Sequence, residues 1–436
     1  MTCELDQTSN GSPTTSRRTF LAASGLGVAG AATMAVTGLG TTLALAAPTG
    51  GGGGDTFVVV FLRGGADGLT MAPPYGYDSY RRLRPNIAVA PPGQNNGALP
   101  LTGGSANGNA VFPTGLDGVV GLHPAMKPVY DALWARGRLA VMPATGLPPS
   151  ESASRSHFSA TRYVTAGSAS SNVGGGWLGR MINLLGAGGA VPAVNTSTRS
   201  KLLSGGQGAV AIPNLGSFGI GPFRNRDRAS QALRALYGGG DSVSAEGRTV
   251  LDVVDRVESI ESGIRPGYPD NGLGRRFSEL ASLIKAGLGV RAAAVDFGGW
   301  DHHRNHGVVG DGRFQDKASE LAGALAGFAN DTNGLEGITV LVLTEFGRTI
   351  NENGNRGTDH GRAATHLAMG AGIRGGVFGD DYPDVIADDR QHGDLTVFTD
   401  FRKVASEIVS QRVGVTDLGV VFPTYQQQGT LGLTRA

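Results

Sequence analysis

The stretch Val295-Asp296-Phe297-Gly298-Gly299-Trp300-Asp301-His302-His303-Arg304-Asn305-His306 places one carboxylate and three histidines directly after an apolar run. The run, residues 290–297, is typical of a buried strand, and the two glycines that follow end it. Open α/β sheets bind ligands in loops at the carboxyl ends of parallel strands. A carboxylate beside imidazole nitrogens is a ligand set suited to zinc, iron or manganese. The stretch therefore predicts a metal or catalytic site, and the alternative is a polar, solvated loop.

Two further apolar runs predict the centre of the same sheet. Residues 56–62 and 337–343 are continuously apolar, as central parallel strands are. Between and after the three runs the pattern predicts helices, at residues 122–134, 226–237, 247–262, 273–286, 315–330 and 398–411. Strands alternating with helices indicate an α/β fold with a doubly wound, mostly parallel sheet and helices on both faces.

Polar side chains follow each of these strands. Because parallel strands bring their carboxyl ends to one edge, we expect six of them to converge in one cleft: Asp67, Asp301, His303, Glu345, Asp359 and His360. For Asp67 the alternative is a turn residue before Gly68. For Arg348, a candidate for binding an anion, the alternative is a salt bridge with Glu345, three residues earlier.

The segment Ser154-Arg155-Ser156-His157-Phe158-Ser159 is predicted to lead into a helix. A serine at a helix N-terminus is usually a cap, but the same N-terminus can support a nucleophile by stabilising an anionic transition state. Adjacent side chains on a helix point about 100° apart, which argues against a dyad of Ser156 and His157. The segment has no G-x-S-x-G elbow, which argues against an ordinary α/β-hydrolase.

The beginning of the chain reads as a targeting segment. Ser16-Arg17-Arg18-Thr19-Phe20-Leu21 is a twin-arginine signature, and Ala44-Leu45-Ala46 offers a cleavage site. We expect a signal peptide over residues 1–46, a flexible Gly-rich lead-in over 47–55 and a single domain with loop-rich insertions over 56–436. The alternative is an uncleaved membrane anchor. The expected location is periplasmic, cell-wall or extracellular.

Composition restricts the partners and the metal ligands. The 436 residues include 37 basic and 36 acidic side chains, for a net charge of +1, so charge gives no reason to expect nucleic acid or an anionic membrane as partner. The only cysteine, Cys3, would leave with the signal peptide. Any metal must then be held by His, Asp or Glu.

The strings VVVFLRGGADGL, GLHPAM, GRLAVMP, SRSHFSA, FGGWDHH, LTEFGRT and GTDHGRA, in this order behind the leader, resemble a bacterial family of unknown function, the domain of unknown function 1501 type. The family is grouped with the alkaline phosphatase and sulfatase superfamily. The resemblance implies an alkaline-phosphatase-like fold in which Asp67 holds a metal and Ser156 is the nucleophile. It also implies that Asp301, His303, Glu345, Asp359 and His360 complete the metal site.

Two departures from the superfamily's pattern put the number and identity of the metals in doubt. Its Asp-His pair at the strand end is Glu345-Phe346 here, and the spacing after Asp301 is short, so that His306 becomes an alternative ligand. The modified nucleophile of cofactor-type sulfatases requires a C/S-x-P-x-R string, which the sequence lacks.

Together these features predict an exported hydrolase of phosphate or sulfate esters that holds one or two divalent ions, zinc, manganese or iron. Displacement would be in line at phosphorus or sulfur, with Arg348 binding the anion. The substrate is expected to be a small anionic ester or an envelope glycan. The alternative is a non-catalytic exported protein that binds a metal or a glycan. A weaker alternative is a hydrolase of another bond type that uses Ser156 and His157.

Overall fold

The computed structural model describes residues 33–36, 41–44, 54–102, 118–152, 154–170, 172–186, 189–198, 200–221, 225–379 and 393–435. Most of the predicted leader, including the twin-arginine signature, lies outside the described residues, as do residues 47–53 of the predicted lead-in. Within the leader, β1 (Thr33–Val36) and β2 (Thr41–Ala44) form an antiparallel pair.

A nine-stranded sheet forms the centre of the molecule, in the order β12-β6-β11-β10-β3-β9-β7-β8, with β13 paired to β6. Its strands are β3 (Thr56–Arg63), β6 (Leu139–Gly146), β7 (Ala193–Asn195), β8 (Ala209–Ala211), β9 (Ala292–Gly298), β10 (Ile338–Thr344), β11 (Ala364–Gly370), β12 (Gly376–Val377) and β13 (Thr399–Asp400). All its pairings are parallel except those of β11 with β10 and β6. This confirms the predicted α/β class with a mostly parallel sheet.

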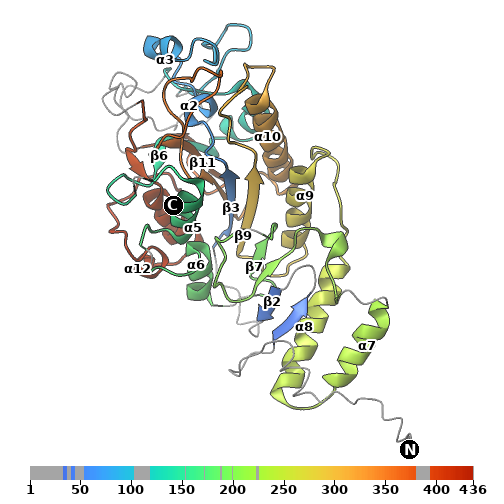
Figure 1. Cartoon of the computed structure of the whole chain (residues 1–436). Helices are drawn as coiled ribbons and strands as arrows, with labels where there is room; N and C mark the ends of the chain where they lie inside the picture. The colour runs from blue at the N-terminus through green and yellow to red at the C-terminus, as the bar shows by residue number, and fades with distance from the viewer. Residues whose placement is uncertain are drawn as a thin grey trace, which may run out of the picture.

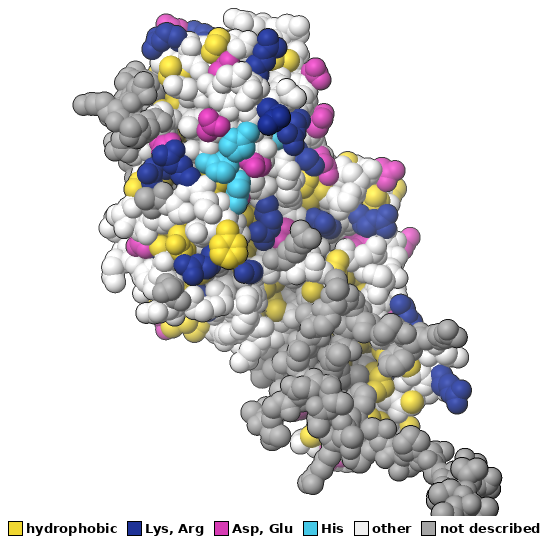
Figure 2. Space-filling view, viewed as in Figure 1, with side chains coloured by type: hydrophobic (Ala, Val, Ile, Leu, Met, Phe, Trp, Pro, Cys, Tyr) yellow, Lys and Arg dark blue, Asp and Glu magenta, His cyan; other side chains and the backbone are white. Residues whose placement is uncertain are grey.

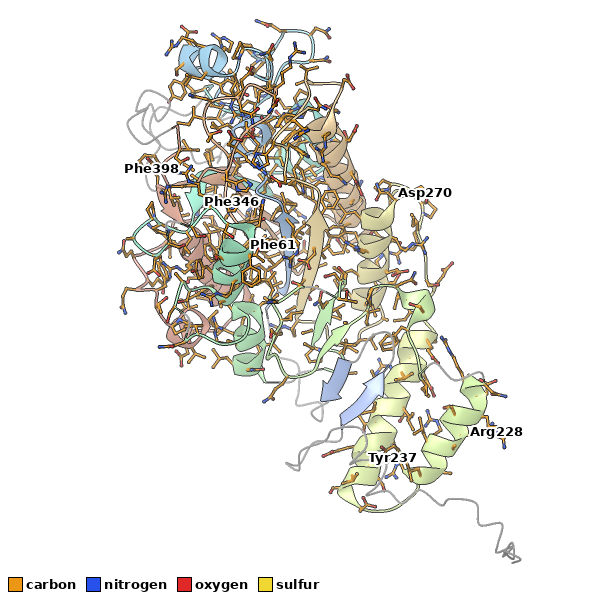
Figure 3. The ribbon with its side chains drawn as sticks, viewed as in Figure 1. Phe61, Arg228, Tyr237, Asp270, Phe346 and Phe398 are labelled. Carbon is orange, nitrogen blue, oxygen red and sulfur yellow. The ribbon has the colours of Figure 1, made fainter. Side chains whose placement is uncertain are left out.

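Both faces of the sheet are apolar, which is why its central strands read as unbroken hydrophobic runs. Along β3, Val58 and Val60 belong to the core on one face, whereas Phe57, Val59 and Phe61 belong to the core on the other. Phe61 lies within the sheet in Figure 3.

Helices cover each face (Figure 1). The core with Val58 also contains residues of α8 (Ser242–Glu258), α9 (Gly272–Lys285), α10 (Arg313–Asp331) and the continuous helical run η1 (Pro124–Met126), α4 (Lys127–Val129) and η2 (Tyr130–Trp134). The core with Phe57 contains residues of α5 (His157–Ala166), α6 (Trp177–Leu185), α11 (Phe401–Ile408), η5 (Val409–Val413) and α12 (Leu418–Val421).

A helical arm extends from the sheet. In Figure 1, α7 (Arg226–Leu236) and α8 lie side by side at the lower right, away from β10 and β3, and Tyr237 marks their junction in Figure 3. The remaining short elements are α2 (Gly68–Met71), α3 (Asp78–Leu83), β4 (Leu99–Pro100), β5 (Gly121–Leu122) and η3 (Leu215–Ser217). Among the described helices, none has the length and apolar character needed to cross a membrane.

One predicted helix has different bounds in the structure, and one strand of the sheet, β11, is antiparallel to its neighbours. Helix α8 begins at Ser242, with the Asp241 side chain as its N-cap, rather than at residue 247. Strand β11 runs against its neighbours, because the segment between β10 and β11 contains no crossover helix and returns to the edge of the sheet that it left. As a result, both ends of this segment lie where β3, β9 and β10 end.

Candidate metal centre

The ends of three neighbouring strands approach one another closely at one edge of the sheet. A Cβ atom on Gly64, after β3, would lie 2.6 Å from the Asp301 amide nitrogen. A Cβ atom on Gly65 would lie 2.5 Å from Cε2 of Phe346. Both glycines also have positive φ, of 120° and 68°. The glycines after β3 therefore allow the strand ends to pack together.

Four side chains meet at this edge: His157 at the start of α5, Asp301 and His303 after β9, and His360 before β11. The Oδ1 atom of Asp301 lies 3.1 Å from His303 Nε2 and 3.3 Å from His360 Nε2, and its Oδ2 atom lies 3.4 Å from His157 Nε2. One ligand atom from each of His157, Asp301 and His360 lies within 4.8 Å of the others. We call these four side chains the histidine cluster. It is partly open to solvent, and Figure 2 shows histidine side chains gathered at the surface with basic side chains on either side.

The other ring nitrogen of each histidine is held by a partner outside the cluster. His157 Nδ1 lies 2.9 Å from Glu345 Oε1, and His303 Nδ1 lies 2.9 Å from Asp359 Oδ1. His360 Nδ1 lies 2.8 Å from the Arg155 carbonyl oxygen. Ligating histidines in metal sites are oriented in this way, by a carboxylate or carbonyl on the far nitrogen.

The residues present fit a divalent cation. Because a carbonyl oxygen only accepts, His360 Nδ1 carries the proton and its Nε2 carries a lone pair. The Nδ1 atom of His303 donates to Asp359, so His303 Nε2 also carries a lone pair. This atom lies only 2.9 Å from His360 Nε2. Two lone pairs at this distance repel unless a proton or a cation lies between them. Imidazole and carboxylate are ligands of zinc, manganese and iron.

The charges of the acidic groups are set by these contacts. Burial alone would raise the pKa of Asp301, but the hydrogen bond and charge of Arg348 lower it to about 2. The hydrogen bond from His303 lowers the pKa of Asp359. The hydrogen bond to Glu345 raises the pKa of His157, against the opposing effect of burial. At neutral pH Asp301 and Asp359 are therefore anionic, as metal ligands and their partners must be.

Arg348 lies beside the cluster but points inward. It is 1% exposed, and its Nη2 atom donates to Asp301 Oδ1 at 2.6 Å. Its Nε atom donates to the Gly65 carbonyl at 2.6 Å, and Nη1 donates to the Thr358 carbonyl at 3.1 Å. The guanidinium thus pairs with Asp301 rather than with Glu345, and its donors serve the protein rather than an incoming anion.

Asp67 lies apart from the histidine cluster, in a buried ion pair. Its Oδ2 atom is 2.7 Å from Arg84 Nη1 and 3.3 Å from His306 Nε2, and its Oδ1 atom accepts the Leu69 amide at the start of α2. Burial alone would raise the pKa of Asp67, but Arg84 and His306 hold it well below its usual value. Two candidate ligands, Asp67 and His306, are therefore brought together with Arg84 rather than with Asp301.

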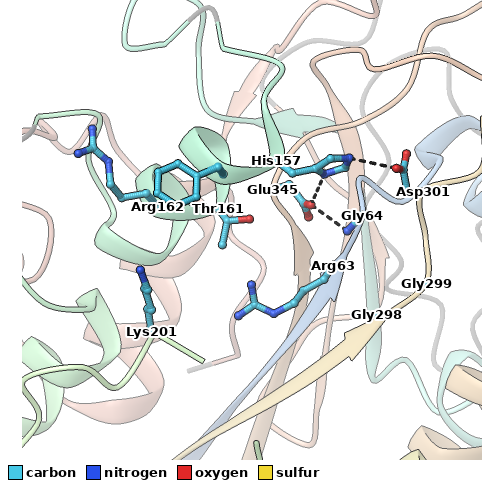
Figure 4. A pocket seen from close by; sticks show the side chains of 11 residues that line it. Arg63, Gly64, His157, Thr161, Arg162, Lys201, Gly298, Gly299, Asp301 and Glu345 are labelled. Atoms are coloured by element: carbon cyan, nitrogen blue, oxygen red, sulfur yellow. Dashed lines mark hydrogen bonds and ion pairs between the residues drawn. The ribbon is translucent and has the colours of Figure 1, made fainter. Parts of the chain in front are cut away.

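Ser156 is the exposed N-cap residue of α5, and its side chain makes no capping hydrogen bond. The next residue, His157, turns into a cavity of about 560 Å³ that borders the cluster, as Figure 4 shows. The cavity is lined by Arg63, Gly64, His157, Phe158, Thr161, Arg162, Lys201, Gly298, Gly299, Asp301 and Glu345. Ser156 is not among the lining residues.

Sequence reasoning missed Phe346 and the basic side chains of the cavity. The Phe346 ring packs with its centroid 4.8 Å from the ring of His157 and 4.8 Å from the ring of His360. Both residues of the Glu345-Phe346 pair therefore support the cluster. Glu345 forms a hydrogen bond with His157, and Phe346 packs against His157 and His360. One signal was present for the cavity, since Arg63 follows the first apolar run directly.

Comparisons with known proteins identify a family and two distant structural likenesses. The family model described as "Protein of unknown function (DUF1501)" matches residues 55–393. No curated protein matches the chain in sequence. A 2-O GAG sulfatase is 9% identical, with 86% of this chain and 76% of that chain covered and a TM-score of 0.31. The alkaline phosphatase from the Antarctic bacterium TAB5 is 10% identical, with 74% and 95% covered and a TM-score of 0.27. Likenesses at these scores carry no weight for the reaction.

Replacing Asp67 by Asn is expected to lower the free energy of unfolding by about 3 to 5 kcal/mol at neutral pH, because Arg84 loses its buried partner. Folding lowers the pKa of Asp67, so its ionised carboxylate stabilises the folded protein. This stabilisation is complete at pH values above the unfolded pKa of about 3.9 and decreases as the pH falls from there toward the folded pKa. Denaturant unfolding should show a constant difference between the two proteins from pH 7 to about pH 4.5, and a difference smaller by only about 1 kcal/mol at pH 3. The control is Asp78→Asn. The Asp78 carboxylate is 89% exposed and pairs with Arg81, so this substitution should change the free energy of unfolding by less than about 1 kcal/mol. Equal stability of wild type and Asp67→Asn at pH 7 would contradict the assignment.

Proposed function

The chain belongs to the DUF1501 family, described as one of unknown function, and from its own residues we propose that it is an exported, metal-dependent hydrolase of phosphate or sulfate esters. The observation that carries the proposal is the histidine cluster. Three imidazoles present Nε2 atoms around the Asp301 carboxylate, while Glu345, Asp359 and the Arg155 carbonyl hold their Nδ1 atoms. A solvated loop gives no reason for all three far nitrogens to be fixed.

His157, His360 and Asp301, whose ligand atoms lie within 4.8 Å of one another, would hold the ion, with His303 beside them. A divalent cation in such a site lowers the pKa of a bound water and polarises the oxygens of an anionic ester. We propose a single ion, because the inner side of Asp301 is already occupied by the Arg348 guanidinium, 2.6 Å from Oδ1. In this arrangement Arg348 supplies a fixed positive charge that neutralises Asp301 and orients it.

The chain's own residues then bind and orient the ester. The cavity is the approach to the cluster, since His157, Asp301 and Glu345 form its wall. The Oε1 atom of Glu345 accepts hydrogen bonds from the Gly64 amide and from His157 Nδ1, and its Oε2 atom accepts from Thr344 Oγ1, so this wall is held from three sides. A phosphate or sulfate ester placed against this wall would meet the cluster at one end, with its leaving group in the cavity.

We assign the attack on phosphorus or sulfur to a water molecule rather than to Ser156. The serine side chain lies outside the cavity lining, whereas His157 and Thr161 of the same helix line it. This differs from the role that the family resemblance implies for Ser156. The displacement remains in line, with the leaving oxygen directed into the cavity.

Export is a separate part of the proposal and rests on the twin-arginine signature, Arg17 and Arg18. Replacing both arginines by lysine should leave the protein in the cytoplasm, because the twin-arginine route reads the pair itself. Cell fractionation with an antibody to the folded domain measures this. As a control, Arg136→Lys, in the folded domain, should be exported as the wild type is. Unchanged export of the double variant would remove this part of the proposal.

Asp301→Ala and His360→Ala are expected to abolish both metal binding and hydrolysis. Elemental analysis of the wild type should find about one zinc, manganese or iron ion per chain, as expected for a single-ion site. A chelator should remove activity on nitrophenyl phosphate or sulfate, and the same ion should restore it. Glu345→Gln should weaken metal binding by roughly 10- to 100-fold, since it only orients His157.

The matched control for these variants is Asp270→Asn, an exposed carboxylate that Figure 3 shows well away from Phe346, whose ring packs on the cluster, and that should change nothing. A wild-type protein that binds none of the three ions after incubation would overturn the metal site. A protein that binds the ion but cleaves no ester would favour the non-catalytic alternative.

Ser156→Ala tests the nucleophile. If water attacks, kcat should stay within about threefold of the wild type, because only an exposed hydroxyl is lost. Loss of a true covalent nucleophile would instead lower kcat by orders of magnitude. Single-turnover kinetics with nitrophenyl phosphate separate these outcomes. A large loss of kcat in this variant with metal content unchanged would return Ser156 to the nucleophile's role.

A further inference from the structure

The cavity extends beyond the histidine cluster, and its far end is lined by basic side chains rather than by histidines and carboxylates. At the near end, His157, Asp301 and Glu345 are engaged with one another or with Arg348. At the other end lie three basic side chains, Arg63, Arg162 and Lys201. Figure 4 shows Arg162 and Lys201 on the side opposite Asp301, with Arg63 between them and the cluster. A volume of about 560 Å³ is larger than a phosphate or sulfate group needs, so most of it faces the leaving group.

The basic side chains are set to receive an anion. Arg63 is held in place by Asp296, at 3.0 Å, and its guanidinium carbon lies 4.9 Å from the centroid of the Phe61 ring. Arg162 and Lys201 are exposed and line the same cavity, from α5 and from the loop after β7, and the Arg162 guanidinium carbon lies 4.9 Å from the centroid of the Tyr163 ring. Among the described residues that line the cavity, the carboxylates are Asp301 and Glu345, both at the cluster end. The far end is therefore positive.

An aromatic ring completes this end. Phe158 lines the cavity on the first turn of α5, and its side chain is 80% exposed. The other large apolar side chains that the structure exposes reach at most 54% among the described residues. An aromatic face left in water beside a cavity can stack on a nucleobase or pack against the apolar face of a sugar ring.

We propose that the far end of the cavity is a subsite for a ring that carries a second anionic group, beyond the ester that is cleaved. Phe158 stacks on the ring, and Arg63, Arg162 and Lys201 bind the second anion. The ligand class is a ring-bearing ester with at least two negative groups. An acidic sugar and a nucleotide both have this chemistry. The subsite deepens the proposed function and rests on it for the position of the scissile ester, but its affinity for a polyanion can be measured without hydrolysis.

The test uses the full metal-loaded protein and the double variant Arg162→Ala/Lys201→Ala, in which both exposed cations are removed. The probes are a monosulfated disaccharide with a uronic acid, a nucleoside bisphosphate and nitrophenyl phosphate. For each ring-bearing probe, the preference is the ratio of its kcat/KM to that of nitrophenyl phosphate. This ratio should fall by about tenfold or more in the double variant, mainly through a higher KM, because the lost charges act on binding. Phe158→Ala should weaken binding of both ring-bearing probes, and Phe158→Trp should retain it.

Arg228→Ala, which removes an exposed cation on the distant helix α7, is the matched control and should leave the preference unchanged. Which of the two ring-bearing probes wins identifies the source, sugar or nucleotide. An unchanged preference in the double variant would overturn the subsite while leaving the proposed function intact.

If no ester is cleaved, isothermal calorimetry with the same probes still tests the subsite. Binding of a ring-bearing probe that weakens by tenfold or more in the double variant would support the subsite although the proposed hydrolysis had failed. Absence of binding of both ring-bearing probes to the wild type would overturn the subsite.

Discussion

One buried guanidinium, that of Arg348, holds the candidate site together. It follows β10 in the chain, donates to the Gly65 carbonyl after β3 and pairs with the Asp301 carboxylate after β9. Carbonyl groups beyond the end of a strand have no hydrogen-bond donor in the sheet, and a charged donor such as a guanidinium forms a strong hydrogen bond with them. The same contact fixes one oxygen of Asp301, so the other is left facing His157. The geometry of the histidine cluster depends on this single side chain.

The centre of the fold could be predicted from the sequence because buried parallel strands are apolar on both faces. The runs that became β3, β9 and β10 are of this kind, and their ends necessarily share an edge. The rule places the loop that contains Asp301 and His303 at the edge where β3 and β10 also end. Asp359 and His360 reach the same edge only because β11 runs antiparallel to its neighbours.

What could not be predicted depends on contacts that the local sequence does not carry. Nothing around Asp67 shows that Arg84, on the end of α3, reaches it and removes it from the cluster. The direction of His157 is set by Glu345, 188 positions later, so the helix start alone could not separate it from Ser156. The direction of β11 is likewise invisible in its composition, since a strand buried on both faces reads the same in either orientation.

The reversed strand β11 has a consequence for how changes in the sequence affect the site. One continuous segment, residues 345–363, leaves the edge of the sheet after β10 and re-enters it before β11. It contains His360, which is a candidate ligand, and Arg348, which pairs with Asp301. It also contains Glu345 and Asp359, whose carboxylates orient His157 and His303. Arg348, in the same segment, also donates to the Gly65 carbonyl after β3. A change anywhere in residues 345–363 therefore acts on the candidate site and on the packing of the strand ends at the same time.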